Sequence, residues 1–249
     1  MSGHSKWAKI KHKKGVTDAK RGAAFTKITR EIVTAAKESG GDPDTNPRLR
    51  TAMARARSLG MPSSNVENAI KKGTGALEGV TYESFTFDAY GSGGVAIFIE
   101  GLTDNKNRTT AEVRTILTRK NGSLATPGSV SFLFNKKGLI EIETKAIEEG
   151  ALMDLALEAG AEDIQTQGDI YEVTTAPTAF EPVRVAIEKK GIAMKSAEVT
   201  MIPTTTIKVA GQDAKNVLAL IEALEDSEDI QSVHANFDIS DEDMAALGE

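Results

Sequence analysis

Residues 137–201 read KGLIEIETKAIEEGALMDLALEAGAEDIQTQGDIYEVTTAPTAFEPVRVAIEKKGIAMKSAEVTM, and their hydrophobic period changes repeatedly. Isoleucine alternates with glutamate over 139–143, as in a strand with one buried face, and the apolar residues of 146–159 recur at helical spacing. The pattern predicts strands at 139–143, 162–166, 170–174 and 193–201, and helices at 146–159 and 180–190. This order, βαββαβ, is the ferredoxin-like supersecondary pattern.

The segments on either side complete a second α+β unit around this one. Before it, strands are expected at 82–90 and 95–100, followed by a helix for which Thr109 and Glu112 form a capping box. After it come a strand at 205–209, a helix at 213–224 and a strand at 230–236. The fold class is therefore α+β. We expect a small N-terminal helical domain and two ferredoxin-like α/β sandwich domains, the third inserted into the second. The expected boundaries are 1–78, 79–134 with 203–249, and 135–202.

Three short helices are predicted in the N-terminal domain, the first over residues 19–37. Phe25, Ile28, Ile32 and Ala36 share one face of it, while Lys20, Lys27, Arg30 and Lys37 share the opposite face. The first helix is thus expected to expose an unbroken basic stripe. Asn46-Pro47 opens the second helix, because proline is well tolerated at the first helical position. Ser64-Asn-Val-Glu67 predicts a capping box for the third.

Charge is distributed very unevenly along the 249 residues. Residues 1–72 hold 16 Lys/Arg against 6 Asp/Glu, a net charge of +10, whereas residues 73–249 hold 14 against 30, a net charge of −16. The overall net charge of −6 and the isoelectric point near 5.3 conceal this asymmetry. A basic segment joined to an acidic remainder favours a nucleic-acid partner for the basic end.

The most basic stretch is Gly3–Gly15, which also holds the only tryptophan. Lysine and arginine neutralise phosphates, and an aromatic ring can stack on an exposed base. The alternative is a solvated tail without a partner. The candidate nucleic-acid-binding residues are Lys6, Trp7, Lys9, Lys11, His12, Lys13, Lys14, Lys20, Arg21, Lys27, Arg30, Arg48, Arg50, Arg55 and Arg57. No helix presents a base-reading set of Arg, Asn and Gln, so backbone and shape recognition is expected.

Asp104-Asn-Lys-Asn-Arg108 precedes a predicted helix, and helix N-termini favour anions. Asn105, Asn107 and Arg108 are therefore a candidate secondary contact, with a loop of turn and capping residues as the alternative. Gly91–Gly94 joins two predicted strands and lacks a following Gly-Lys-Ser/Thr, so it is interpreted as a hairpin turn, not a phosphate loop.

Several classes of protein are disfavoured. Cysteine is absent, which excludes disulfides, cysteine-ligated zinc and thiol catalysis. The sequence has neither a long apolar run nor a secretory signal, so no membrane association is expected. His4, His12 and His234 lack metal-ligand spacing, and Glu141 with Glu143 is interpreted as a solvated strand face. We expect no catalytic residue, metal, cofactor or small-molecule substrate; a hydrolase using acidic residues is the least favoured hypothesis.

Several motifs together resemble the YebC/PmpR family, which includes mitochondrial translational activators. They are Gly3-His-Ser-Lys-Trp-Ala, Lys11-His-Lys-Lys, Asp18-Ala-Lys-Arg, Phe25-Thr-Lys-Ile-Thr-Arg-Glu-Ile, Met61-Pro with Ala69-Ile-Lys-Lys-Gly73, Tyr90-Gly-x-Gly-Gly-Val-Ala, Thr103-Asp-Asn-Lys-Asn-Arg-Thr and Gly128-Ser-Val-Ser-Phe. Asp88 and Ser92 depart from the family pattern, where Glu and Pro are usual.

The resemblance implies a cytoplasmic, non-enzymatic regulator. Members are commonly described as DNA-binding transcriptional regulators. The alternative that the family offers is a ribosome-associated translation factor that contacts rRNA or tRNA and relieves stalling. In either case, the acidic domains are expected to position the basic segment or to meet a ribosomal or protein partner.

Overall fold

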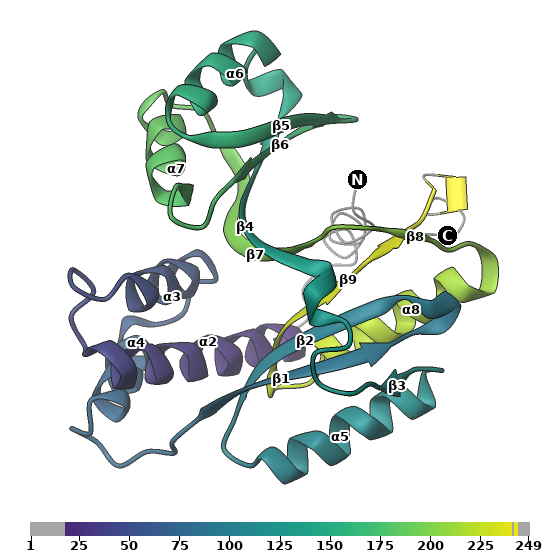
Figure 1. Cartoon of the computed structure of the whole chain (residues 1–249). Helices are drawn as coiled ribbons and strands as arrows, with labels where there is room; N and C mark the ends of the chain where they lie inside the picture. The colour runs from purple at the N-terminus through teal and green to yellow at the C-terminus, as the bar shows by residue number, and fades with distance from the viewer. Residues whose placement is uncertain (1–17, 241, 244–249) are drawn as a thin grey trace. The chain divides into compact units, whose positions relative to one another are not determined.

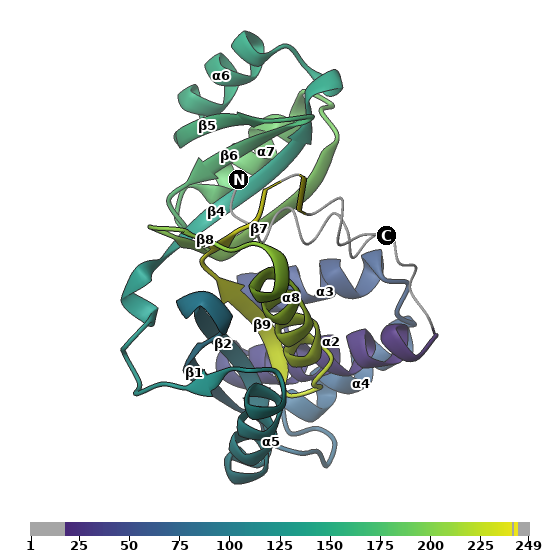
Figure 2. The ribbon, with the colours of Figure 1, turned by 90° about the vertical axis from the view of Figure 1, so that its right-hand side faces the viewer.

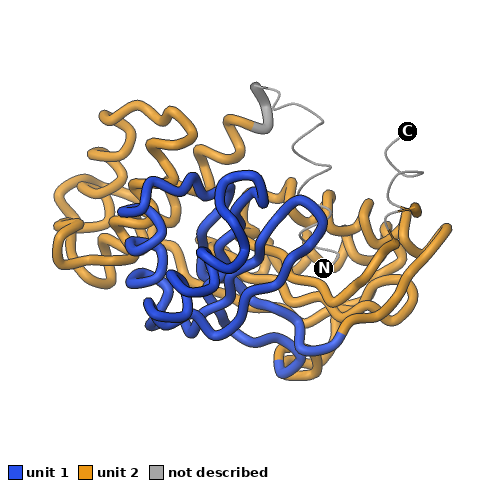
Figure 3. The backbone as a smooth tube through the Cα atoms, turned by 90° about the horizontal axis from the view of Figure 1, so that it is seen from above, with its two compact units in different colours: residues 1–2, 132–205 blue, residues 3–131, 206–249 orange. Residues whose placement is uncertain are grey.

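The computed structural model describes residues 18–240 and 242–243. The candidate residues Lys6, Trp7, Lys9, Lys11, His12, Lys13 and Lys14 therefore lie outside the described residues. The described residues divide into two compact units (Figure 3): residues 132–205 form one, and residues 18–131 and 206–243 belong to the other. The N-terminal helices share the second of these units with a sheet, so the three-domain division given above stays a prediction. No helix among the described residues is long and apolar enough to cross a membrane.

The unit of residues 132–205 is built on one antiparallel sheet, with strand order β5-β6-β4-β7. Its elements are β4 (Phe134–Glu143), α6 (Glu149–Glu158), β5 (Ala161–Gln167), β6 (Ile170–Thr175), α7 (Phe180–Lys189) and β7 (Met194–Pro203). Ile140, Ile142 and Val173 point to the side where Leu152 of α6 and Ile187 of α7 pack, and all five side chains are fully buried. The predicted order βαββαβ is present here.

The other unit has its own four-stranded antiparallel sheet, with strand order β3-β1-β2-β9. Its elements are β1 (Glu83–Tyr90), β2 (Ala96–Thr103), α5 (Lys106–Arg119), β3 (Ser123–Leu124), α8 (Gly211–Glu225) and β9 (Ile230–Ala235). The expectation of a second ferredoxin-like domain is wrong for this sheet, because its element order is ββαβ followed by αβ. The hairpin turn at 91–94 makes β1 and β2 neighbours, and β3 and β9 then take the two outer edges.

Helices α5 and α8 cover one face of this sheet (Figure 2). Phe85, Ile97 and Ile99 of the strands pack in one cluster with Val113 of α5 and Ile221 of α8. A two-stranded parallel ladder, β8 (Ile207–Lys208) with β10 (Phe237–Asp238), follows the return of the chain from the other unit. The long crossing that leads to β4 is tied down by one side chain: the buried carboxylate of Asp88 accepts hydrogen bonds from the backbone N–H groups of residues 130 and 131.

The N-terminal helices α2 (Asp18–Ser39), α3 (Pro47–Ser58) and α4 (Ser63–Gly73) pack against one another (Figure 1). Ile28 and Ile32 of α2 meet Leu49 and Ala52 of α3 and Ala69 of α4, so the predicted inner face of the first helix is confirmed. The predicted capping box of α4 does not form. The helix begins at Ser63, directly after Pro62, and its first turn has no side-chain cap.

Candidate nucleic-acid interface

Helix α3 carries exposed basic side chains without any acidic residue in the same helix. Its sequence contains four arginines and no acidic residue. Arg50, Arg55 and Arg57 are exposed, and Lys71 and Lys72 at the end of α4 are exposed as well. We call these five side chains the α3–α4 basic surface. Arg50, Arg55 and Arg57 have no acidic neighbour along α3, whereas Glu67 lies one turn before Lys71 on α4. The three arginines are therefore the part of this surface that best attracts phosphates.

The position of α3 is fixed at its first turn by Asn46. Its side-chain oxygen accepts a hydrogen bond from the backbone N–H of Leu49 at 3.0 Å, which caps the helix. Its amide group donates to the backbone oxygens of Ala35 and Gly40, both at 2.8 Å, and thereby ties α3 to the end of α2. Asn46 is almost completely buried. The predicted opening of this helix at Asn46-Pro47 is confirmed.

Arg48 differs from the other arginines of α3. Its guanidinium donates to the carboxylate of Glu31 at 2.8 Å and to that of Glu38 at 2.5 Å, both on α2. The hydrogen bond with Glu31 contributes most to raising the pKa of Arg48, against the lowering effect of burial. Arg48 therefore holds α3 against α2, and its charge is balanced within the protein.

Helix α2 does not expose an unbroken basic stripe, so that expectation is wrong. Arg21 and Lys37 are exposed, but Lys27 is half-buried and donates to the backbone oxygen of Glu225 at 2.5 Å. Arg30 is only 8% exposed. The reason is that the loop between α8 and β9 covers this face of α2. Lys20 lies in α2, and its side chain is outside the described part of the structure.

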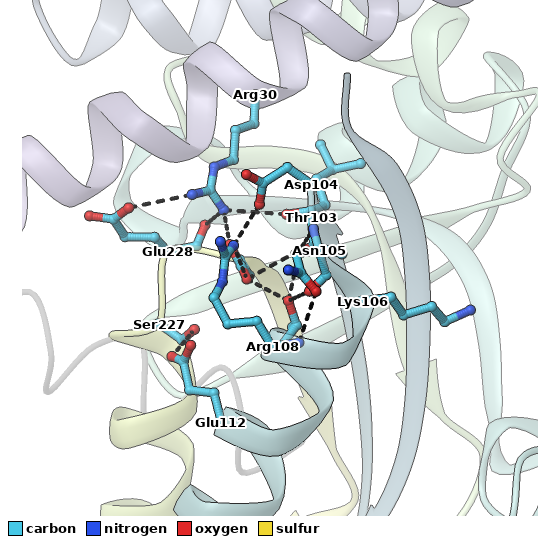
Figure 4. Close-up of polar contacts among 12 residues, drawn as sticks. Arg30, Thr103, Asp104, Asn105, Lys106, Arg108, Glu112, Ser227 and Glu228 are labelled. Atoms are coloured by element: carbon cyan, nitrogen blue, oxygen red, sulfur yellow. Dashed lines mark hydrogen bonds and ion pairs between the residues drawn. The ribbon is translucent and has the colours of Figure 1, made fainter. Parts of the chain in front are cut away.

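Arg30 enters a polar cluster that gathers around one carboxylate (Figure 4). Its guanidinium forms an ion pair with Asp229 and donates to the backbone oxygen of Glu228 at 2.8 Å. Arg108 donates to Asp229 at 3.1 Å, and the hydroxyl of Thr109 does so at 2.5 Å. The side chain of Asp229 is 5% exposed, so three donors from α2 and α5 converge on a buried charge.

The pKa of Asp229 reflects this environment. Burial raises it, but the hydrogen bonds from Thr109, Arg108 and Arg30 outweigh burial, and the pKa is lowered from its ordinary value. The Asp229 carboxylate is therefore ionised at neutral pH and serves as the common acceptor of the cluster. Sequence reasoning missed it, because an acidic run such as Glu225-Asp-Ser-Glu-Asp229 has the composition of a solvated loop.

The predicted secondary contact at residues 105–108 belongs to the same cluster. Asn105 caps α5 by accepting a hydrogen bond from the backbone N–H of Arg108 at 3.1 Å. The predicted capping role of Thr109 is wrong, because its hydroxyl is buried and binds Asp229 and Thr103. Arg108 binds Asp104 at 2.6 Å as well as Asp229. Asn107 is exposed, and Lys106 points away from the cluster in Figure 4.

A cavity of about 400 Å³ opens beside the cluster. Its lining holds two arginines and five carboxylates: Arg30, Arg108, Asp104, Glu112, Asp226, Glu228 and Asp229, together with Tyr82 and Ser227. Acidic side chains outnumber basic ones in this lining, so the cavity repels phosphate. The guanidinium of Arg108 is also already bound to carboxylates. No group of three or more His, Asp or Glu side chains in the described part of the chain is arranged to hold a metal ion.

The comparisons with known proteins cover nearly the whole chain. Residues 5–76 match the family model described as the TACO1/YebC protein N-terminal domain, and residues 82–237 match the model described as the TACO1/YebC second and third domain. The chain belongs to the TACO1/YebC family. The resemblance to YebC proteins drawn from the sequence motifs is thereby confirmed.

Relatives of this TACO1/YebC chain are similar over nearly their full length. A probable transcriptional regulatory protein of Citrifermentans bemidjiense is 53% identical over 247 residues, covering 99% of this chain and 100% of the relative. A protein of Treponema pallidum with the same description is 52% identical, covering 97% and 99%. The crystal structure of a conserved hypothetical protein from Aquifex aeolicus is 42% identical, with a TM-score of 0.80, covering 90% of this chain and 93% of that one.

Proposed function

We propose that this TACO1/YebC protein is a non-enzymatic, cytoplasmic regulator of transcription that binds the phosphate backbone of DNA through its basic N-terminal segment. The observation that carries the proposal is the α3–α4 basic surface, where Arg50, Arg55 and Arg57 project from a helix without a single acid. The basic residues of 6–14 and Arg21 precede it along the chain and extend the same charge. The names of the bacterial relatives, probable transcriptional regulatory proteins, support DNA as the polyanion.

Recognition through this surface is expected to be independent of base sequence. Helix α3 has no Asn or Gln beside its arginines, and its other exposed side chains, among them Thr51 and Ser58, are short, so it lacks a mixed set of base-reading side chains. Phosphate contacts instead make binding depend steeply on salt. The logarithm of the affinity should fall with the logarithm of the salt concentration by roughly 0.9 for each contact on duplex DNA and by about 0.7 on single strands.

Replacing Arg50, Arg55 and Arg57 with alanine tests the proposal. The triple variant should bind duplex DNA more weakly and reduce the salt slope by up to about 2.7, because three phosphate contacts are lost. Fluorescence anisotropy across a salt series measures both quantities. The matched control replaces Arg114 and Arg119 of α5 and its C-cap residue Lys120 with alanine, because these side chains are exposed and carry the same total charge. Equal losses in the two triple variants would contradict a specific role for α3.

The alternative polyanion is ribosomal RNA or tRNA, as the translational members of the family suggest. The same surface serves either partner, because phosphates are common to both. Crosslinking the full chain in cells, followed by identification of the attached fragments, separates them. Recovery of rRNA or tRNA without DNA would replace the transcriptional proposal with a ribosome-associated one, and cosedimentation with ribosomes at moderate salt would support that outcome.

A further inference from the structure

The helical segment α2–α4 and the adjacent sheet have separate apolar cores. Among the described residues, the cluster around Ile28, Ile32 and Leu49 shares no member with the cluster around Ile97 and Ile99 of the sheet. Tyr82, in the connection before β1, packs at the edge of the helical cluster. The helices are therefore not held on the sheet by a continuous hydrophobic core of the kind that joins α5 and α8 to it.

Polar contacts hold the two parts together instead, and they come from one face of α2. Lys27 donates to the backbone oxygen of Glu225. Arg30 binds Asp229, the backbone oxygen of Glu228, and the backbone oxygen of Leu102 at 3.3 Å. We call this set the Arg30–Asp229 latch. Leu102 lies at the end of β2 and Glu225 at the end of α8, and the remaining acceptors lie in the loop between α8 and β9.

The contact is also incomplete. The Nε atom of Arg30 and the hydroxyl of Thr34, one helical turn apart on α2, are buried and have no hydrogen-bond partner among the described residues. Burying a donor without an acceptor costs free energy that an apolar interface would not lose. The docked arrangement of α2 is consequently less favourable than its burial suggests.

We infer that the helical segment has an undocked state in which the Arg30–Asp229 latch is open. In that state, Arg30 and Lys27 become accessible beside the α3–α4 basic surface, and α2 exposes the continuous basic face that its sequence encodes. A polyanion and the Asp229 carboxylate then compete for the same guanidinium. Because nucleic acid binds the undocked state better, it shifts the population toward that state, and docking lowers its apparent affinity. The inference of an undocked state depends only on the contacts of the Arg30–Asp229 latch. The competition between nucleic acid and Asp229 also rests on the proposed function.

The undocked state is tested first without nucleic acid. The chain lacks cysteine, so single cysteines introduced at the exposed positions Ser58 of α3 and Thr118 of α5 can carry spin labels in the full-length protein. Asp229→Asn should add a second, broader population to the distance distribution measured by pulsed electron paramagnetic resonance. Asp226→Asn removes an equal charge from an exposed position three residues earlier and should leave the distribution unchanged.

Arg30→Gln opens the latch from the other side, and it keeps the inference testable if Asp229→Asn fails to fold by circular dichroism. It should produce the same second population. Identical distance distributions in the wild-type protein, Asp226→Asn and every folded latch variant would show that the latch does not control docking and would overturn the inference.

Binding then tests the competition. Asp229→Asn should bind a short duplex DNA about threefold more tightly than Asp226→Asn does, because a larger fraction of molecules is binding-competent. Arg30→Gln should undock without this gain, since the guanidinium itself is missing. If Asp229→Asn and Asp226→Asn bind DNA with equal affinity, any gain over the wild-type protein comes only from the loss of a negative charge at long range. That result would refute the competition between nucleic acid and Asp229 for Arg30. If the wild-type protein binds neither DNA nor RNA, the proposed function fails, while the spin-label distances still decide whether the helices undock.

Discussion

Asn46 shows how one side chain sets the direction of a functional helix. It caps α3 with its oxygen and holds the end of α2 with its amide, so α3 cannot rotate without losing three hydrogen bonds. The orientation of Arg50 and Arg57, two turns apart on α3, follows from this anchor.

Asn46→Ala is predicted to destabilise the protein by about 2 kcal/mol, because the cap is lost and the carbonyls of Ala35, which is buried, and Gly40 lose their donor. Asn46→Ser keeps a neutral capping oxygen and loses only the donated bonds, so its cost should be smaller, about 1 kcal/mol. Urea denaturation followed by circular dichroism measures both. Equal costs would show that the cap contributes nothing.

Asp229 gives the protein an acid-sensitive contribution to stability. Its pKa is lower in the folded state than in the unfolded chain, so the unfolded state takes up the proton first as pH falls. The contribution is fully present at pH values above the pKa of Asp229 in the unfolded chain. It is lost as pH falls through the pKa of Asp229 in the folded protein. Replacing Asp229 leaves Arg30 buried without its ion-pair partner. Asp229→Asn should therefore cost about 3 kcal/mol at neutral pH.

The same reasoning predicts how this cost changes with pH. The difference in unfolding free energy between the wild-type protein and Asp229→Asn should be constant from pH 7 to about pH 4 and shrink below it. Denaturation at a series of pH values measures the difference. A constant difference down to pH 2 would mean that Asp229 is not the titrating group.

At the scale of elements, the packing of α4 on α2 depends on a glycine. A Cβ atom on Gly73 would lie 2.5 Å from the backbone oxygen of Val33 and 2.7 Å from the Cβ of Ala36. The end of α4 approaches the backbone of α2 too closely for any side chain, so the helices would have to separate to admit one.

Gly73→Ala is therefore predicted to destabilise the helical segment by about 1–3 kcal/mol, through overpacking. Gly22→Ala is the matched control, because Gly22 lies in α2 with no atom within 4 Å of the position of its Cβ. There the same substitution should stabilise by about 0.5–1 kcal/mol, since alanine loses less backbone entropy in a helix. Thermal denaturation compares the two, and a change of the same sign in both would contradict the packing argument.

Local elements could be predicted from the sequence, whereas their long-range partners could not. Periodicity located the helices and the strands of residues 137–201, because both depend on neighbours within a few positions. The cap of α5 was misassigned since Asn105 and Thr109 have similar capping chemistry, and only the fold shows that Asp229 engages the hydroxyl of Thr109.

The burial of Arg30 could not be predicted from the sequence, because it too depends on long-range partners. On α2 it occupies the face expected to meet solvent, and its acceptors lie about two hundred positions away in the chain. The exposed arginines of α3 were predicted as candidates directly, because their exposure follows from the local pattern alone. Their contact with nucleic acid stays a prediction.

At the scale of the whole molecule, residues 132–205 behave as an insertion whose two ends lie side by side. Phe134 of β4 pairs with Pro203 of β7, and the backbone N–H of Thr204 donates to the oxygen of Leu133 at 2.8 Å. The core clusters of the other unit contain no residue of this insertion. Joining Ser131 to Thr206 through a short Gly-Ser linker should therefore leave that unit folded.

Removing the insertion also removes 13 acidic and 7 basic residues, a net charge of −6. The shortened protein should bind duplex DNA roughly threefold more tightly at low salt, with the gain fading as salt screens the repulsion. Circular dichroism checks the fold, and anisotropy checks the binding. Weaker binding by a folded variant would mean that the insertion contributes contacts of its own.

The place of Asp229 in the chain has a consequence for biosynthesis. Helices α2–α4 make local contacts and can form once residue 73 has left the ribosome, whereas β9 and the loop before it are among the last segments to emerge. A nascent chain therefore carries folded helices with Arg30 still uncovered for most of its synthesis. Each new molecule passes through an open, strongly cationic form before the latch can close, at a time when it is surrounded by RNA.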